Sequence, residues 1–145
     1  MVVKVPHTCI PCRSQERLEE ISQYTSEDMK LRNFRDPNAW DDLVDILIYH
    51  PSSITRHEAS FIIAELDDSY LTSRLMQVVK FDRSIVAKHE AVEALGRTTK
   101  DVKRVYQFLR NIITPGIYDD EVYHPDVQAT AQESMRALKK QLNAA

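Results

Sequence analysis

The chain has 145 residues, of which 43% are hydrophobic and 28% are charged, and its formal net charge is −3 at pH 7. A chain of this length fits a single domain with a hydrophobic core. The negative charge excludes the basic surface typical of nucleic-acid-binding proteins, and no apolar run is long enough to cross a bilayer. Because glycine occurs only at Gly96 and Gly116, glycine-rich phosphate-binding loops are excluded too.

The scarcity of glycine and the short gaps between periodic segments predict an all-α protein. We expect eight helices in four successive pairs. They cover residues 14–24 with 26–34, 38–50 with 53–67, 68–80 with 84–96, and 101–113 with 124–142. Residues 1–13 are expected to be an N-terminal arm, and residues 14–145 a single repeat domain.

The first pair carries the weakest pattern. Ser26 is expected to cap the helix at 26–34, and Leu31 and Phe34 to share its buried face. Met29 falls outside this stripe.

The two middle pairs have clearer apolar stripes. Pro51 ends the helix at 38–50, and Gly96 stands where a C′ glycine is expected to end the helix at 84–96. The residues expected in the core are Trp40, Leu43, Val44 and Leu47, then Ala59, Ile62, Ile63 and Leu66, then Leu71, Leu75 and Val78, then Ala87, Ala91, Ala94 and Leu95.

The fourth pair is interrupted by a longer loop. The expected core positions are Val102, Val105, Leu109 and Ile112, followed by Val127, Ala131, Met135, Leu138 and Leu142. The loop at 114–125 is acidic and carries Asp119, Asp120 and Glu121.

Each helical pair is too small to bury its own apolar face. Four pairs stacked in chain order would share one continuous core, which is the principle of an α-solenoid. The sequence therefore predicts an α-α superhelix of about four helical hairpins.

A four-residue motif occurs twice in this arrangement. Residues 56–59 read Arg-His-Glu-Ala and residues 88–91 read Lys-His-Glu-Ala, so the two histidines are 89 − 57 = 32 residues apart. Both motifs fall in the second helix of a pair, and such neighbouring helices lie about 8–10 Å apart. We therefore expect His57, Glu58, His89 and Glu90 to line one patch of the concave face. Nitrogen and carboxylate ligands with open positions suit non-haem iron, with manganese and zinc as alternatives.

The same motif also has a purely structural interpretation. Short HEAT-type repeats commonly begin their second helix with a pattern like V-R-x-E-A-A-x-A-L-G, and residues 86–96 read "VAKHEAVEALG". The basic residue and the glutamate would then serve only the helix. This resemblance identifies the predicted superhelix as HEAT-like.

The tandem His-Glu motifs within four helical pairs resemble one half of deoxyhypusine hydroxylase. The resemblance extends from Ser26 to Leu142. It rests on "KLRNFRDPNAW", "RHEASFIIAELDD", "KHEAVEALGRTTKDV" and "VQATAQESMRAL", the last of which lacks the histidine. That family has two such halves, and each supplies two His-Glu motifs to a shared di-iron centre. This chain has one.

The resemblance implies a metal-binding oxidoreductase, an O₂-dependent monooxygenase that hydroxylates an amine-bearing substrate. His57, His89 and Glu90 would be iron ligands, and Glu58 would be a ligand or would hold the substrate amine. A homodimer would complete the di-iron centre. The acidic loop, with Asp119, Asp120 and Glu121, would guide a cationic substrate, unless it is simply solvated.

Two other functions stay open. The chain is alternatively a non-catalytic HEAT-repeat scaffold that binds a protein on its concave face, or a HEAT protein similar to bilin lyases. The pair Cys9 and Cys12 stands alone near the start of the chain, which favours an unstructured arm over a zinc site. Two cysteines and no export signal lead us to expect a cytoplasmic protein.

Overall fold

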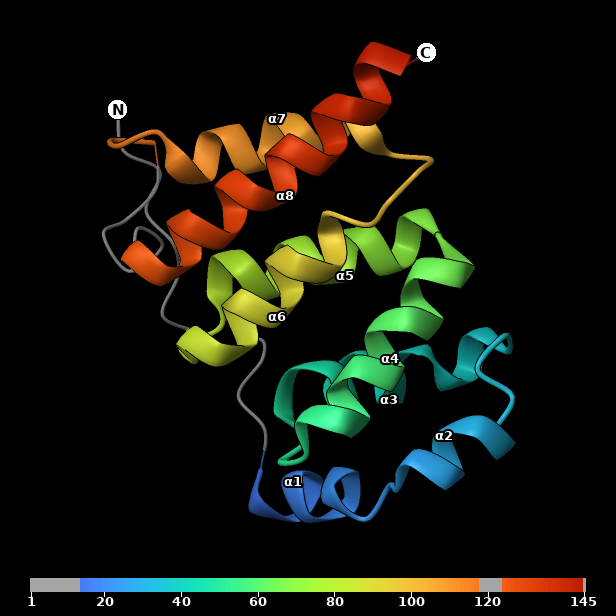
Figure 1. Cartoon of the computed structure of the whole chain (residues 1–145). Coiled ribbons are helices and arrows are strands. Elements are labelled where there is room, and N and C mark those ends of the chain that lie inside the picture. The colour runs from blue at the N-terminus through green and yellow to red at the C-terminus, as the bar shows by residue number, and fades with distance from the viewer. Residues whose placement is uncertain (1–13, 118–123, 145) are drawn as a thin grey trace.

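The computed structural model describes residues 14–117 and 124–144, which form eight α-helices and one short 3₁₀ helix without any strand (Figure 1). The all-α prediction is confirmed. The elements are α1 (Gln15–Ser22), α2 (Ser26–Leu31), the 3₁₀ helix η1 (Pro37–Ala39), α3 (Trp40–Tyr49), α4 (Ser53–Leu66), α5 (Ser69–Phe81), α6 (Ile85–Leu95), α7 (Val102–Ile113) and α8 (Pro125–Ala144).

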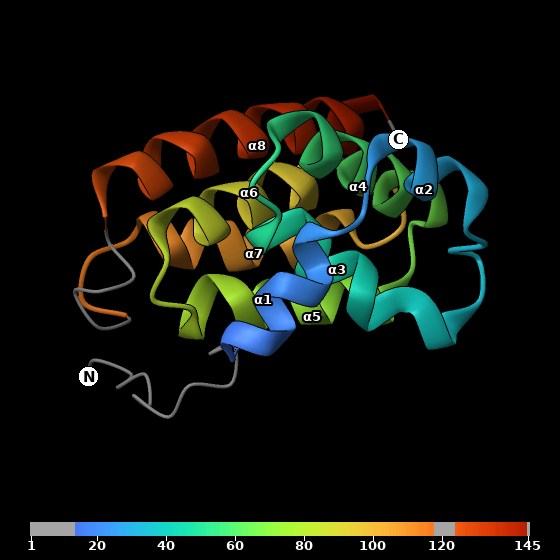
Figure 2. The same ribbon diagram turned by 90° about the horizontal axis from the view of Figure 1, so that it is seen from below.

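The helices alternate between two layers along the chain (Figure 2). In one layer α2, α4, α6 and α8 contact one another in this order, and we call them the second helices. In the other layer α3 contacts both α1 and α5. The two layers are joined within the pairs α3–α4, α5–α6 and α7–α8, and by a contact between α3 and α6.

Short polar residues determine where most helices begin. The side chains of Ser52, Asp68 and Ser84 accept hydrogen bonds from the first-turn backbone amides of α4, α5 and α6. Such caps satisfy amide groups that have no partner within the helix. For this reason the expected starts at residues 53, 68 and 84 agree with the structure to within one residue.

The predicted pattern of α2 is wrong. Thr25 rather than Ser26 caps the helix, in a capping box with Asp28. Met29 is buried at 1% exposure, whereas Leu31 is 78% exposed at the helix end. Phe34 is buried, but it lies after the helix and packs from the following turn.

The core positions expected for α3 to α8 are buried or half-buried. The fully buried ones include Leu43, Val44, Leu47, Ala59, Ala87, Ala91, Val105, Leu109, Ile112, Val127, Ala131 and Leu138, each 0% exposed. They form one continuous cluster that includes residues from every helix.

Gly96 has a different role from the predicted one. It is the C-cap residue of α6 with a φ of −65°, so its backbone is not left-handed. A Cβ at this position would lie 2.5 Å from Ser134 Oγ and 2.7 Å from Ser134 Cβ. Glycine is therefore needed because α8 approaches α6 closely here.

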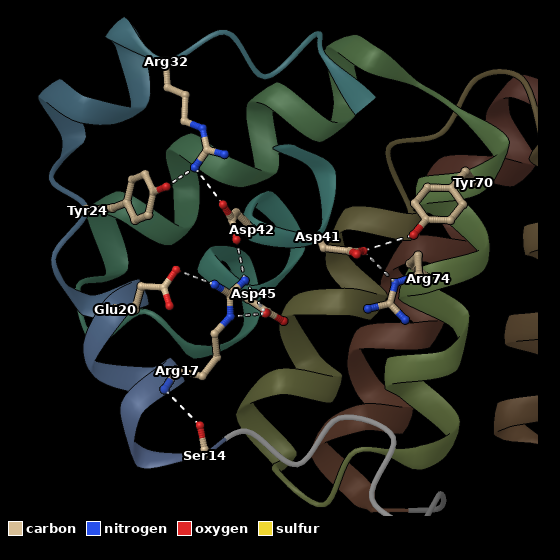
Figure 3. Close-up of polar contacts among 10 residues, drawn as sticks. All are labelled: Ser14, Arg17, Glu20, Tyr24, Arg32, Asp41, Asp42, Asp45, Tyr70 and Arg74. Carbon is tan, nitrogen blue, oxygen red and sulfur yellow. Dashed lines mark hydrogen bonds and ion pairs between the residues drawn. The ribbon is translucent and has the colours of Figure 1, made fainter. Parts of the chain in front are cut away.

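Charged side chains attach α1 and α2 to α3 (Figure 3). Arg17 lies 2.5 Å from an Asp42 carboxylate oxygen and 2.9 Å from one of Asp45, and Arg32 lies 2.8 Å from Asp42. Burial alone would raise the pKa of the Asp42 carboxyl, but the hydrogen bonds from Arg17 and Arg32 outweigh it and lower that pKa below 3.8.

A buried histidine connects the α1–α2 turn to the α3–α4 turn. His50 is 4% exposed, its Nε2 lies 2.6 Å from the Tyr24 carbonyl oxygen, and the Ser52 amide donates to its Nδ1 over 3.0 Å. A neutral ring with its proton on Nε2 satisfies both contacts. Burial, together with the positive charge of Arg56, lowers the pKa of His50 below its ordinary value of 6.5.

We expect the protein to lose stability as the pH falls below 6.5, the ordinary pKa of histidine. In this range unfolded His50 binds a proton that folded His50 does not bind, so acid favours the unfolded chain. The paired Asp42 acts in a separate window, because its contribution is lost only below its ordinary pKa of 3.8. Urea unfolding at about pH 7.5 and about pH 5 measures the difference. His50→Gln should reduce this dependence on pH, and an unchanged dependence would contradict the assignment.

Candidate functional site

The two repeated motifs lie in the same register of α4 and α6. Ser52 caps α4 and Ser84 caps α6, so each motif histidine follows its cap by five residues (57 − 52 = 5 and 89 − 84 = 5). The side chains of the two motifs therefore leave their helices in corresponding directions.

The basic residue and the alanine of each motif face the protein. Ala59 and Ala91 are fully buried, and Lys88 is 2% exposed. Arg56 donates from Nη1 to the carbonyl oxygen of His50 over 2.6 Å. Because His50 is the C-cap residue of α3, this contact satisfies an acceptor at a helix end. These two motif positions thus have a structural role.

Glu90 is held by the basic residue of the other motif. Its Oε1 atom lies 3.5 Å from Arg56 Nε, and the two side chains are 18% and 19% exposed. This pair joins α6 to α4 and balances a mostly buried positive charge. The carboxylate of Glu90 is therefore engaged within the fold.

His89 is oriented by α8. Its Nδ1 lies 2.7 Å from Thr130 Oγ1, and Thr130 Oγ1 donates to the carbonyl oxygen of Asp126 over 3.0 Å. Because a hydroxyl has one proton, Thr130 accepts from His89 Nδ1–H. The other ring nitrogen, Nε2, lies 3.4 Å from Glu93 Oε2, and the histidine side chain is 42% exposed.

The histidine and the glutamate of the first motif lie in different surroundings. His57 is exposed to solvent, whereas Glu58 is half-buried and lines a groove between α2 and α4. The groove beside α8 that contains His89 does not include either residue.

The four residues expected to share one hollow thus have four different surroundings. Solvent surrounds His57, the segment after α2 faces Glu58, α8 contacts His89, and Arg56 holds Glu90. Among residues 14–117 and 124–144, no three or more His, Cys, Asp or Glu side chains are grouped to hold a metal ion. A single chain, as far as it is described, does not assemble the expected centre.

Two expectations lie outside the described residues. They are the substrate-guiding role of Asp119, Asp120 and Glu121, and the N-terminal arm with Cys9 and Cys12.

The sequence interpretation missed a set of exposed apolar side chains. Ile54 and Phe61 of α4 are 67% and 58% exposed, and Val86 of α6 is 56% exposed. Ile54 and Val86 are 86 − 54 = 32 residues apart, the same interval as the histidines. This interval was the available signal, since a β-branched residue precedes each motif, three positions before its histidine.

A groove between α6 and α8 was also not predicted. His89 lies at the junction of its two parts, which have volumes of about 410 and 290 Å³. On α8 the groove is lined by Asp126, Ala129, Thr130, Glu133, Ser134 and Ala137. The small residues create the space, and the carboxylates of Glu93, Asp126 and Glu133 make it acidic.

Comparison with known protein families, with curated proteins and with solved structures finds no significant match. The similarity to deoxyhypusine hydroxylase therefore stays a prediction from the motifs. None of the described helices combines the length and apolarity needed to traverse a membrane.

We expect the two residues that begin the first motif to affect stability very differently. Arg56→Met should lower the free energy of unfolding by about 1–3 kcal/mol, because the His50 carbonyl loses its hydrogen-bond donor and the Glu90 carboxylate loses its ion-pair partner. His57→Ala should change it by less than about 0.5 kcal/mol, because the side chain is exposed. Urea unfolding of both variants tests this, and the reverse order would refute the structural role of Arg56.

Proposed function

We propose that this protein is a HEAT-like helical-repeat scaffold that binds a protein segment on the outward face of its second helices. We call this the second-helix face and define it by Ile54, His57 and Phe61 of α4, Val86, His89 and Glu93 of α6, and Asp126, Ala129 and Glu133 of α8. The stacking of α2, α4, α6 and α8 in chain order supports the HEAT-like arrangement.

The observation that carries the proposal is the duplicated exposed pair on this face. Ile54 and Val86 are exposed apolar residues, each followed three positions later by a histidine. Neither contributes to the buried core, so the fold gives no reason for an apolar side chain at both places. Exposed apolar side chains on one face are typical of surfaces that bind other proteins.

The charge of the face defines its partner. Asp126 and Glu133 of α8 are exposed, seven residues apart, and therefore about 10 Å apart along the helix. The nearby cation Arg97 is already engaged, because it donates to Ser60 Oγ, lies 3.4 Å from Glu93 and covers the Phe61 ring. A partner segment with apolar and basic side chains complements this face.

Selection from a random peptide display library on the immobilised full chain tests the proposal. The enriched peptides should contain both Lys or Arg and large apolar residues, because the face is acidic and apolar. Binding of these peptides should be lost in the variant with Ile54→Ser and Val86→Ser. The exposure of both side chains means that this variant should stay folded, within about 1 kcal/mol of the wild type.

Leu31→Ser is the matched control, because Leu31 is an exposed apolar residue at the end of α2 and outside the face. The control should bind the selected peptides as the wild type does. Equal binding by the double variant, or selection of acidic peptides only, would refute the proposal.

A metal-dependent oxygenase is the second candidate. The orientation of His89 favours it, because Nδ1 donates to Thr130 and Nε2 is the ring nitrogen that remains for a metal. The donors of one described chain diverge, so a di-iron centre would require the ligands of a second copy in a homodimer. Its chemistry when loaded would be the O₂-dependent oxidation of a C–H bond.

Iron analysis after anaerobic reconstitution with Fe(II), combined with a mass measurement in solution, separates the two candidates. The scaffold proposal predicts no stoichiometric iron. A dimer with about one iron per chain, lost on His57→Ala with His89→Ala, would instead establish the metal centre.

A further inference from the structure

The groove between α2 and α4 is a second hollow, separate from the apolar pairs of the second-helix face. It has a volume of about 310 Å³. One wall is the end of α2 and the turn that follows it, and the other is the face of α4 that carries Glu58, Ile62, Glu65 and Leu66. Neither Phe61 nor Val86 lines it.

The α4 wall carries two carboxylates with aliphatic residues beside them. Glu58 and Glu65 are seven residues apart on one helix, which is about two turns and about 10 Å. Ile62 lies between them and Leu66 follows them, both half-buried. Glu58 is half-buried as well, so water only partly solvates its carboxylate.

The opposite wall carries cations. Lys30 and Arg35 are exposed at this wall. Arg32 also lines it, but it is committed to Asp42 and to the hydroxyl of Tyr24. Met29 and Phe34, which are 1% and 3% exposed, provide an apolar floor between the charged walls.

The charges of the two walls do not neutralise each other. Within residues 14–117 and 124–144, Lys30, Arg35, Glu58 and Glu65 form no ion pair, although the neighbouring Arg56 and Glu90 do. These four residues therefore contribute no ion pair to the described fold. Opposite charges face each other across an apolar strip.

We propose that this groove binds a zwitterion, a molecule whose ammonium and carboxylate groups are separated by an aliphatic chain. The ammonium group would contact Glu58 or Glu65, and the carboxylate would contact Lys30 or Arg35. The chain between them would cover Ile62, Phe34 and Met29. A molecule with only one charge leaves one wall without a partner, so both charges are required for full affinity.

Titration of the ¹⁵N-labelled full chain with a series of ω-amino acids tests the site. The probes are glycine, 4-aminobutyrate, 6-aminohexanoate and 8-aminooctanoate, with hexylamine and hexanoate as singly charged controls. Saturable amide shifts should occur at the residues of the groove, with an optimum chain length that fits the distance between its walls. The singly charged controls should bind about twofold to fivefold more weakly than the best zwitterionic probe.

Variants on each wall of the groove then show which wall binds the ammonium group and which binds the carboxylate. Glu58→Gln and Arg35→Gln should each weaken binding of the best probe about twofold to fivefold, since each removes one partly solvated charge pair. Glu16→Gln, at an exposed position on α1 outside both surfaces, is the matched control and should leave the affinity unchanged. The absence of saturable shifts, or equal affinity for 6-aminohexanoate and hexanoate, would overturn the proposal. These outcomes do not depend on peptide binding by the second-helix face.

Discussion

The close approach of α6 and α8 is the contact on which the rest of the structure depends. At Gly96 there is no room for even a methyl group beside Ser134, whose hydroxyl donates to the Val92 carbonyl oxygen over 3.0 Å. Ala91 of α6 and Ala131 of α8 are small and fully buried. This packing orients His89 toward Thr130 and leaves the groove between the two helices.

Polar contacts between successive pairs repeat at nearly the interval of the sequence motif. Tyr49 and Asp82 are 33 residues apart, Asp67 and Thr98 are 31 apart, and Arg56 and Glu90 are 34 apart. Each contact links one pair to the next. In the proposed HEAT-like arrangement, such nearest-neighbour contacts contribute to stability, because a single pair cannot bury its own apolar face.

The sequence allowed the helices of the last three pairs to be predicted, because local signals specify them. Pro51, Ser52 and Ser84 determine where helices end and begin, and the apolar spacing identified the buried faces. The prediction was wrong at α2, since a six-residue helix offers too little periodicity to distinguish Met29 from Leu31.

The directions of the motif side chains were not predictable from the sequence. They depend on how α4 and α6 are rotated relative to their neighbours, which is a property of tertiary packing. Spacing placed His57 and His89 in one register, but it did not reveal that Arg56 holds Glu90 or that α8 holds His89. The Gly96 assignment was wrong for the same reason, because Ser134 is distant in sequence.

The duplicated motif therefore combines two separate roles. Its basic residue and alanine hold neighbouring helices together, and its histidine, with the apolar residue three positions earlier, faces outward. The outward positions are available for binding because the inward positions supply the packing. The same division explains why the exposed apolar residues repeat although the core does not use them.

The free energy of unfolding of the Gly96→Ala variant tests most directly whether the structure depends on the close approach of α6 and α8. Gly96→Ala should lower the free energy of unfolding by about 1–3 kcal/mol and shift the amide resonances of His89 and Thr130, as α6 and α8 move apart. Gly116→Ala, whose Cβ would meet nothing within 4 Å, should cost only about 1–2 kcal/mol from its φ of +87° and leave those shifts unchanged. A Gly96→Ala protein with wild-type stability and unchanged shifts in the groove would contradict the account.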